Sequence, residues 1–332
     1  FLGRARMVAS RLPEKMLLFL SDTEVTKPKD ETHQKLHNFL WDSFIPPAME
    51  RTAQPVFQAY IDELIKDLQK NGLPPSKNDA RNAVEVFITK YMMNALFGLG
   101  LGLVTEAQLK DIRTLFFSAN PMRNYVTAAV KPLRLSSCCS PFITRTYEMT
   151  LDLVENSPAL ADYEPSEANA FVSKREFSDI IMTVAGIAAF GGTANQCVNI
   201  LTEIPDEYPI DVDNKVEVFK AALEATRRRS PVNNVNVIMQ EATEIDINGR
   251  KVEFPVGTVV AACICLASLD EKVYPNPDTF NPKRENLVSA NLNFNMVGFN
   301  TTENGRRNCP GRNIAMKVAC DVLVAYRNAT SA

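Results

Sequence analysis

Cys309 lies in a short segment whose glycines and following helix constrain the local fold more than any other part of the sequence. Gly305 precedes the cysteine by four positions and Gly311 follows it by two. Because glycine has no Cβ, such a loop lets the backbone pass close to a flat group beside the sulfur. A helix predicted from about Arg312 points its N-terminus at the sulfur, which favours a thiolate over a thiol. Cys309 is therefore the first candidate functional residue, and the alternative is a buried structural cysteine in a Gly/Pro turn.

The composition bounds the class of protein. A chain of 332 residues with 45% apolar residues can bury a large core, and one unit over residues 1–332 is the simplest organisation. The formal net charge is −3, so the chain lacks the excess of basic residues that is typical of nucleic-acid-binding proteins. We recognise no signal peptide and no apolar run that could span a bilayer, while contact with a membrane surface stays open.

The cysteines indicate a reducing environment. There are 7 of them, an odd count without regular spacing, which argues against a disulfide framework. We therefore expect an intracellular protein, with the compartment or organelle left open. Cys263 and Cys265 alternate in an apolar run, which predicts that both lie in the core.

Helical periodicity dominates the first half of the chain, and strand-like runs occur only in the second half. Capping boxes at Thr105 and Ser173 mark two of the predicted helix starts, and Asn248-Gly249 is a hairpin signal. The predicted helices cover residues 31–44, 54–69, 80–97, a segment from 105, a segment from 173, 216–229 and 312–327. The predicted strands cover residues 234–239, 244–247, 251–254 and 258–264. The sequence thus predicts a mainly α fold with a small β region.

A glutamate–arginine pair forms a second motif upstream of the cysteine. Glu224 and Arg227 are three residues apart, which places both on one helical face. The proline-rich stretch 274–284 follows and supplies a second guanidinium, Arg284. A carboxylate held by two arginines can be buried where a lone ion pair would be costly. The alternative is an ordinary solvated pair on a helix surface.

In this order, the glutamate–arginine helix, the proline loop and the glycine-flanked cysteine resemble the cytochrome P450 superfamily. The resemblance implies a cytochrome P450 fold, haem b as cofactor, and Cys309 as the ligand of the haem iron. It implies that Glu224, Arg227 and Arg284 form a structural triad beneath the haem. The implied haem-binding residues are Cys309, Arg307, Gly305, Gly311, His33 and His37. The N-terminal β region and C-terminal β hairpin of the family are expected to be absent from this chain.

His33 and His37 are the only histidines of the sequence and stand at i and i+4. That spacing could also hold a metal ion, but no third ligand cluster is evident. By resemblance the pair lies where family members contact the haem propionates, which is the interpretation we favour.

A finer resemblance points to the allene oxide synthase, hydroperoxide lyase and epoxyalcohol synthase family. Residues 173–192 are similar to the central helix of that family, and residues 27–40 are similar to its histidine-bearing helix. The loop over residues 298–309 is lengthened, which is typical of the same family. Thr302 stands where ordinary cytochrome P450 members have an aromatic residue.

Residues around Thr193 bear on the type of reaction. Gly192 stands where a monooxygenase has an acid, so proton delivery during oxygen activation is harder. Ala188 stands where the hydroperoxide family has a catalytic asparagine, and alanine cannot form that hydrogen bond. Asn195 and Gln196 follow about two turns later, and either amide could take over the role. The alternative is that both only make polar contacts late in the helix.

The sequence therefore predicts a haem-thiolate lyase or isomerase that rearranges polyunsaturated fatty acid hydroperoxides in oxylipin metabolism, without oxygen or a reductase. The predicted catalytic residues are Asn195, Gln196 and Thr193. The predicted substrate pocket contains Ile187, Ala188, Phe190, Gly191 and Gly192. Two alternatives stay open: a conventional monooxygenase, and a non-catalytic relative that binds haem or lipid.

Overall fold

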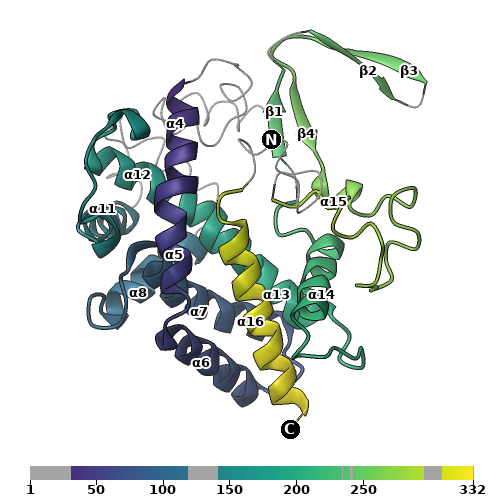
Figure 1. Ribbon diagram of the computed structural model, residues 1–332, viewed down its shortest axis with the longest axis horizontal. Helices are drawn as coiled ribbons and strands as arrows, with labels where there is room; N and C mark the ends of the chain where they lie inside the picture. The colour runs from purple at the N-terminus through teal and green to yellow at the C-terminus, as the bar shows by residue number, and fades with distance from the viewer. Residues whose placement is uncertain are drawn as a thin grey trace.

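The computed structural model describes residues 31–118, 141–294 apart from 234, 240, 241 and 248, and 309–331. Helices make up most of this fold, and two β ribbons project from one side of it (Figure 1). The helices are α4 (Glu31–Phe39), α5 (Ile45–Arg51), α6 (Pro55–Asn71), α7 (Lys77–Phe97), α8 (Glu106–Arg113), α11 (Pro141–Glu155), α12 (Lys174–Val184), α13 (Thr193–Glu203), α14 (Lys215–Arg228), α15 (Ile264–Ala267) and α16 (Arg312–Ser331). Two π-helical segments join neighbouring helices, η1 (Leu40–Phe44) between α4 and α5 and η6 (Ala185–Gly192) between α12 and α13, and a third, η2 (Thr114–Ser118), continues from α8. Short 3-10 turns are η4 (Pro158–Leu160) and η5 (Glu167–Asn169). The prediction of a mainly α fold with a small β region is confirmed.

Local capping explains where several helices begin. The Thr105 hydroxyl accepts from the Gln108 amide, and the Gln108 side chain accepts from the Thr105 amide, so the predicted capping box is present. The Ser173 hydroxyl accepts from the Glu176 amide at the start of α12. Asn214 caps α14 through its side-chain oxygen. These bonds satisfy backbone amides that have no partner within the helix.

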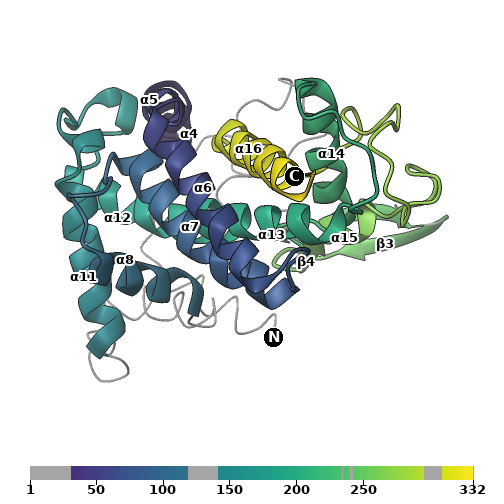
Figure 2. The same ribbon diagram turned by 90° about the horizontal axis from the view of Figure 1, so that it is seen from below.

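The run α12–η6–α13 is the central helix of the fold. Its C-terminal part, α13, packs against α7, α14 and α16, and Figure 2 shows this group seen from below. The π-helical segment η6 consists mainly of alanine and glycine, and its surface is therefore smooth enough for rings to approach. The Phe116 ring packs so close to Gly186 that a Cβ there would lie 2.4 Å from it.

The apolar core falls into two clusters. The larger joins α4–α7, α12, η6 and α13 with one side of α16, and contains Phe177 and Phe190. The smaller joins α13, α14 and α16 with the loop that carries Phe280. Because α13 and α16 contribute to both clusters, they are held rigidly between them.

The strands form two antiparallel ribbons: β1 (Val235–Ile238) pairs with β4 (Val259–Ala262), and β2 (Thr243–Ile247) pairs with β3 (Arg250–Phe254). Gly249, with φ of +82°, lies in the turn of the predicted hairpin. The predicted strand over 258–264 is too long, because α15 begins at Ile264. Cys263 is exposed and Cys265 half-buried, so their predicted core position is wrong. Neither cysteine lies in a strand, because β4 ends at Ala262 and Cys265 lies in α15.

In the described part of the chain, each helix is too short or too polar to traverse a lipid bilayer.

Candidate functional site

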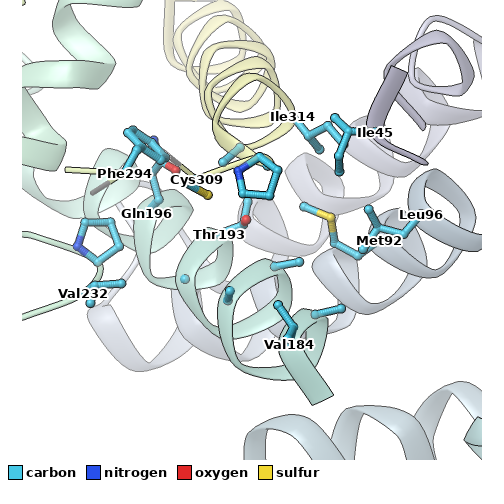
Figure 3. A pocket seen from close by; sticks show the side chains of 18 of the residues that line it. Ile45, Met92, Leu96, Val184, Thr193, Gln196, Val232, Phe294, Cys309 and Ile314 are labelled. Carbon is cyan, nitrogen blue, oxygen red and sulfur yellow. The ribbon is translucent and has the colours of Figure 1, made fainter. Parts of the chain in front are cut away.

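A cavity of about 280 Å³ opens beside Cys309, between α13 and the start of α16 (Figure 3). Its walls come from η1 and the start of α5, from α7, from the α12–η6–α13 run, from the segment after α14, and from the start of α16. Among the described residues that line it none is charged, and the polar ones are Thr193, Gln196, Thr226, Asn293 and Cys309. The remaining lining is Leu40, Phe44, Ile45, Met92, Leu96, Ile181, Val184, Ala185, Ala188, Ala189, Gly192, Pro231, Val232, Ile264, Phe294, Pro310, Gly311, Ile314 and Ala315. Such a lining suits a largely apolar ligand.

Cys309 is held by its own backbone with its sulfur at the cavity. Its amide donates to the Phe294 carbonyl at 2.9 Å, and its carbonyl accepts from the Arg312 amide at 3.3 Å. A Cβ on Gly311 would lie 3.9 Å from Sγ, so the turn passes close beneath the sulfur. Burial raises the pKa of the Cys309 thiol, while the amides of Gly311 and Arg312 and the Arg312 guanidinium lower it. Burial outweighs these donors, so the pKa of the Cys309 thiol lies above its ordinary value, although the helix N-terminus and Arg312 act in the direction of a thiolate.

Thr193 and Gln196 both line the cavity, as Figure 3 shows. The orientation of the Gln196 amide is fixed by its surroundings. Its Nε2 lies 3.3 Å from the Thr226 hydroxyl and 3.1 Å from Sδ of Met316. The Thr226 hydroxyl already donates to the Ala222 carbonyl, and a thioether only accepts. Both partners therefore require the nitrogen, which leaves Oε1 as an acceptor without a hydrogen bond among the described residues.

Asn195 does not line the cavity. Its Oδ1 accepts from Arg81 at 2.9 Å, and its Nδ2 donates to the Pro231 carbonyl at 3.2 Å. Both ends of the Asn195 amide are thus bonded to protein groups outside the cavity. Of the two amides considered from the sequence, only Gln196 faces the site.

The predicted pocket residues divide between the cavity and the core. Ala188 and Gly192 line the cavity, and a Cβ on Gly192 would meet nothing within 4 Å. Phe190 is fully buried elsewhere, with its ring 4.6 Å from that of Phe116, because it lies on the other face of η6. Gly191 is likewise outside the lining. The side chain of Ile187 lies outside the described residues.

Glu224, Arg227 and Arg284 meet as the resemblance implies. Arg227 donates to Glu224 through Nε at 2.8 Å and through a terminal nitrogen at 2.9 Å. Arg284 Nε donates to the same carboxylate at 3.1 Å, as does the Asn281 amide at 3.0 Å. Glu224 and Arg227 are both completely buried. A carboxylate with four donors can be kept charged in the interior.

The arginines use their other nitrogens to hold the proline-rich loop. Arg227 donates to the carbonyls of Ser268 and Pro277, each at 2.6 Å, and its guanidinium lies 4.8 Å from the centre of the Tyr274 ring. Arg284 donates to three loop carbonyls, those of Pro275, Asn276 and Thr279. The cluster therefore ties the loop to α14, next to the helix residue Thr226 that faces the cavity.

Several predicted haem contacts can be placed only in part. His37 is buried and stacks on Trp41 with 6.4 Å between ring centres, and the Arg312 guanidinium lies 5.3 Å from the same indole. Neither His37 nor Trp41 lines the cavity. Arg307, Gly305 and the side chain of His33 lie outside the described residues, as do Gly298 and Thr302.

Much of the cavity wall was not predicted. Leu40, Phe44, Met92 and Leu96 lie in predicted helices, but nothing in their spacing marked them as cavity residues. No sequence pattern indicated that Asn293 lines the cavity. Only the run of small residues in η6 hinted that a group could approach this helix closely.

The comparisons with known proteins agree with this geometry. The family profile described as Cytochrome P450 matches residues 206–320, which contain the Glu224 cluster and Cys309. Cytochrome P450 3A15 from Cavia porcellus is 23% identical over 88% of this chain and 66% of its own length, so the chain spans slightly less than two thirds of that relative. Cytochrome P450 monooxygenase FUP2 from Fusarium proliferatum is 21% identical over 91% of this chain and 67% of its own. A crystal structure of cytochrome P450 CYP109B1 from Bacillus subtilis has the same fold, with TM-score 0.58, 19% identity, and coverage of 96% of this chain and 84% of that one.

Residues 206–320 thus match the cytochrome P450 family, and the described part of the chain has the cytochrome P450 fold. Family members bind haem b through an iron centre, and the residues present here fit that group. The Cys309 sulfur faces an uncharged cavity, and the space beside Gly192 is open where a Cβ would intrude. Cys309 would hold the iron, the turn at Gly311 would pass under the ring, and the η6–α13 helix would cover its other face.

Proposed function

We propose that this chain is a cytochrome P450 that rearranges fatty acid hydroperoxides, as a lyase or isomerase, and needs neither molecular oxygen nor a reductase. The observation that carries the proposal is the absence of any charged residue among the described residues lining the cavity, with Gly192 directly before Thr193. A monooxygenase requires protons during oxygen activation, and a carboxylic acid near the site assists their delivery. A hydroperoxide arrives with its O–O bond already formed, so it makes no such demand.

The lining supports a long-chain substrate. Apolar side chains extend from Leu40 and Phe44 on one side to Pro231 and Val232 on the other. An acyl chain buries its surface well against such walls, whereas a polar substrate would lose its hydrogen bonds with water. Val232 is 47% exposed and also lines the cavity, which places it at the mouth.

Gln196 and Thr193 support recognition of the hydroperoxide group. Gln196 presents a fixed acceptor, Oε1, because both its amide hydrogens face Thr226 and Met316. The O–H of a hydroperoxide is a donor and can bond to this oxygen. The Thr193 hydroxyl, which is also at the cavity, can both donate and accept. Together they would orient the peroxide and hold its proton, in place of the amide that is missing at Ala188.

Haem with a thiolate ligand supplies, when bound, the redox chemistry at the O–O bond. The contribution of the chain is to bind the apolar arm, to orient the peroxide and to exclude water from the cavity. The resemblance to allene oxide synthase, hydroperoxide lyase and epoxyalcohol synthase supports this class but leaves the product among the three open.

The second candidate is a conventional monooxygenase. It is favoured by the relatives, one of which is named a monooxygenase, and by the presence of Thr193 at the cavity. The two candidates differ in what they require: the monooxygenase needs oxygen and an electron donor.

The deciding experiment uses the chain expressed with haem supply. The reduced carbon monoxide spectrum first tests for a thiolate ligand. A polyunsaturated fatty acid hydroperoxide is then added without oxygen or a reductant, and the products are identified. Conversion at a rate that Gln196→Leu lowers at least tenfold supports the proposal. An unchanged hydroperoxide, together with oxidation of the parent fatty acid when oxygen and a reductase are supplied, would establish the monooxygenase instead.

A further inference from the structure

The segment Ser230–Val232 forms one wall of the cavity without belonging to a helix or a strand. It follows Arg229, the residue that ends α14, and Pro231 and Val232 line the cavity together with residues of η6. Ser230 bonds within the segment, to the Val232 carbonyl at 2.6 Å, and to Asn293 at 2.8 Å. A wall of this kind has few backbone bonds of its own, so its position depends on side chains from neighbouring elements.

Asn195 is the α13 side chain that holds this wall directly. Its Nδ2 donates to the Pro231 carbonyl, and its Oδ1 accepts from Arg81 of α7. Because a guanidinium only donates, the amide has one orientation: oxygen towards Arg81 and nitrogen towards Pro231. Arg81 in turn lies 3.8 Å from Glu85, which pairs with Arg113 at 3.4 Å.

Asn199 offers a natural comparison one turn further along α13. Its Nδ2 donates to the Arg229 carbonyl at 2.7 Å. That carbonyl belongs to the end of α14 and has no intrahelical donor, so the bond acts as a helix cap. Arg229 does not line the cavity. The two asparagines thus make bonds of the same chemistry to neighbouring carbonyls, but only Asn195 holds a wall residue.

We propose that Asn195 is a positioning residue, which sets the place of the Pro231–Val232 wall relative to α13 and so determines how the apolar arm of a ligand fits. The helix that carries Asn195 also carries Thr193 and Gln196 into the cavity. The bond to Pro231 therefore fixes the distance of the apolar wall from Thr193 and Gln196. The inference rests on the proposed use of the cavity for an apolar substrate, but not on the reaction carried out there.

Asn195→Asp is the informative variant. It preserves size and the oxygen that faces Arg81, but it replaces the donor towards Pro231 by an oxygen that repels the carbonyl. Asn199→Asp makes the same chemical change at the helix cap and serves as the matched control. Arg81→Ala removes the hydrogen bond to Asn195 Oδ1 and leaves Nδ2, the donor to Pro231, in place.

The first measurement compares two haem ligands in the loaded protein: imidazole, and 1-dodecylimidazole, whose long apolar arm would have to be accommodated by the cavity walls. We expect Asn195→Asp to lower the affinity for dodecylimidazole by roughly fivefold more than the affinity for imidazole. This is the size of effect expected when the wall loses one hydrogen bond. Asn199→Asp and Arg81→Ala should leave the ratio within about twofold. Equal ratios for the two aspartate variants would overturn the proposal.

The second measurement needs no haem. Hydrogen exchange at the Val232 and Asn233 amides should be faster in Asn195→Asp than in Asn199→Asp, because only the first frees the wall. Equal exchange would count against the role of Asn195 even if the chain failed to take up haem. Neither azole is a hydroperoxide, so failure of the protein to turn over hydroperoxides would refute the proposed reaction while leaving both results interpretable.

Discussion

Glu224 and Arg227 form a doubly hydrogen-bonded ion pair from which water is completely excluded. One carboxylate oxygen also accepts from Arg284, so the charge is shared between two guanidiniums. The pair joins α14 to the loop that carries Ser268 and Pro277. This geometry makes the cluster a support for the cavity wall, since Thr226 of the same helix turn faces the cavity.

Removing one partner of this pair should destabilise the protein strongly. We expect Arg227→Met to lower the free energy of unfolding by about 3–5 kcal/mol, because Glu224 would keep a buried charge with one guanidinium fewer. The double variant Glu224→Met/Arg227→Met should cost less than the sum of the single changes. Urea unfolding of the haem-free chain measures both.

Arg229→Met is the control for that experiment. Its side chain is 64% exposed and pairs with Glu203 at 3.2 Å, so the change should stay within about 1 kcal/mol. Similar losses at positions 227 and 229 would show that the buried cluster has no special role in stability.

Gly186 and Phe116 should be energetically coupled. A Cβ at position 186 would lie 2.4 Å from the Phe116 ring, which would have to leave its place against Phe190. We expect Gly186→Ala to destabilise the fold by about 1–3 kcal/mol. In the Phe116→Ala background the same change should be nearly neutral, since the ring is gone. A double-mutant cycle without coupling would contradict this packing.

Gly192→Ala should separate stability from ligand binding. The added methyl group would meet no atom within 4 Å, so the haem-free fold should be unchanged or slightly more stable. The methyl group would nevertheless occupy the open space of the cavity beside Thr193. Haem uptake, measured by absorbance titration, should therefore weaken, and an unchanged affinity would place the ring elsewhere.

Cys309→Ser should remove the thiolate signature from the reduced carbon monoxide spectrum. The hydroxyl would lack the electron donation that a cysteine sulfur gives to iron. Cys320→Ser is a suitable control, because Cys320 is half-buried on α16 and does not line the cavity. A thiolate spectrum that survived in Cys309→Ser but not in the control would assign the ligand to another cysteine.

The sequence predicted the chemistry of local motifs better than the shape of the site. The turn at Gly311 and the Glu224–Arg227 pair each lie within a few residues, so their geometry depends little on distant parts of the chain. Arg284, which also donates to Glu224, lies far along the sequence and was placed there only by the resemblance. The wall formed by Phe44 and Met92 depends on how η1 and α7 pack around α13, which helical spacing alone does not specify.

Sequence spacing left Asn195 and Gln196 as equal candidates for a specific reason. Counting two regular turns from Ala188 leads to Asn195. The segment η6 is π-helical, however, with hydrogen bonds that span five residues instead of four. Each such turn contains an extra residue, which rotates the following helix. Gln196 therefore shares the cavity face with Ala188 and Gly192, and Asn195 turns towards Arg81.

The fixed orientation of the Gln196 amide leads to a last prediction. Gln196→Glu would place an oxygen against the Thr226 hydroxyl and Met316 Sδ, which both act as acceptors towards this side chain. We expect a loss of about 1–3 kcal/mol in the free energy of unfolding, because a buried carboxylate would lack donors. Gln196→Met has a similar volume and introduces no buried charge, and Thr226 keeps its bond to Ala222, so the loss should be smaller. If glutamate were tolerated better than methionine in thermal unfolding of the haem-free chain, the amide would have the opposite orientation and its nitrogen would face the cavity. A hydroperoxide would then meet a donor at Gln196, and the proposed recognition of its O–H group would fail.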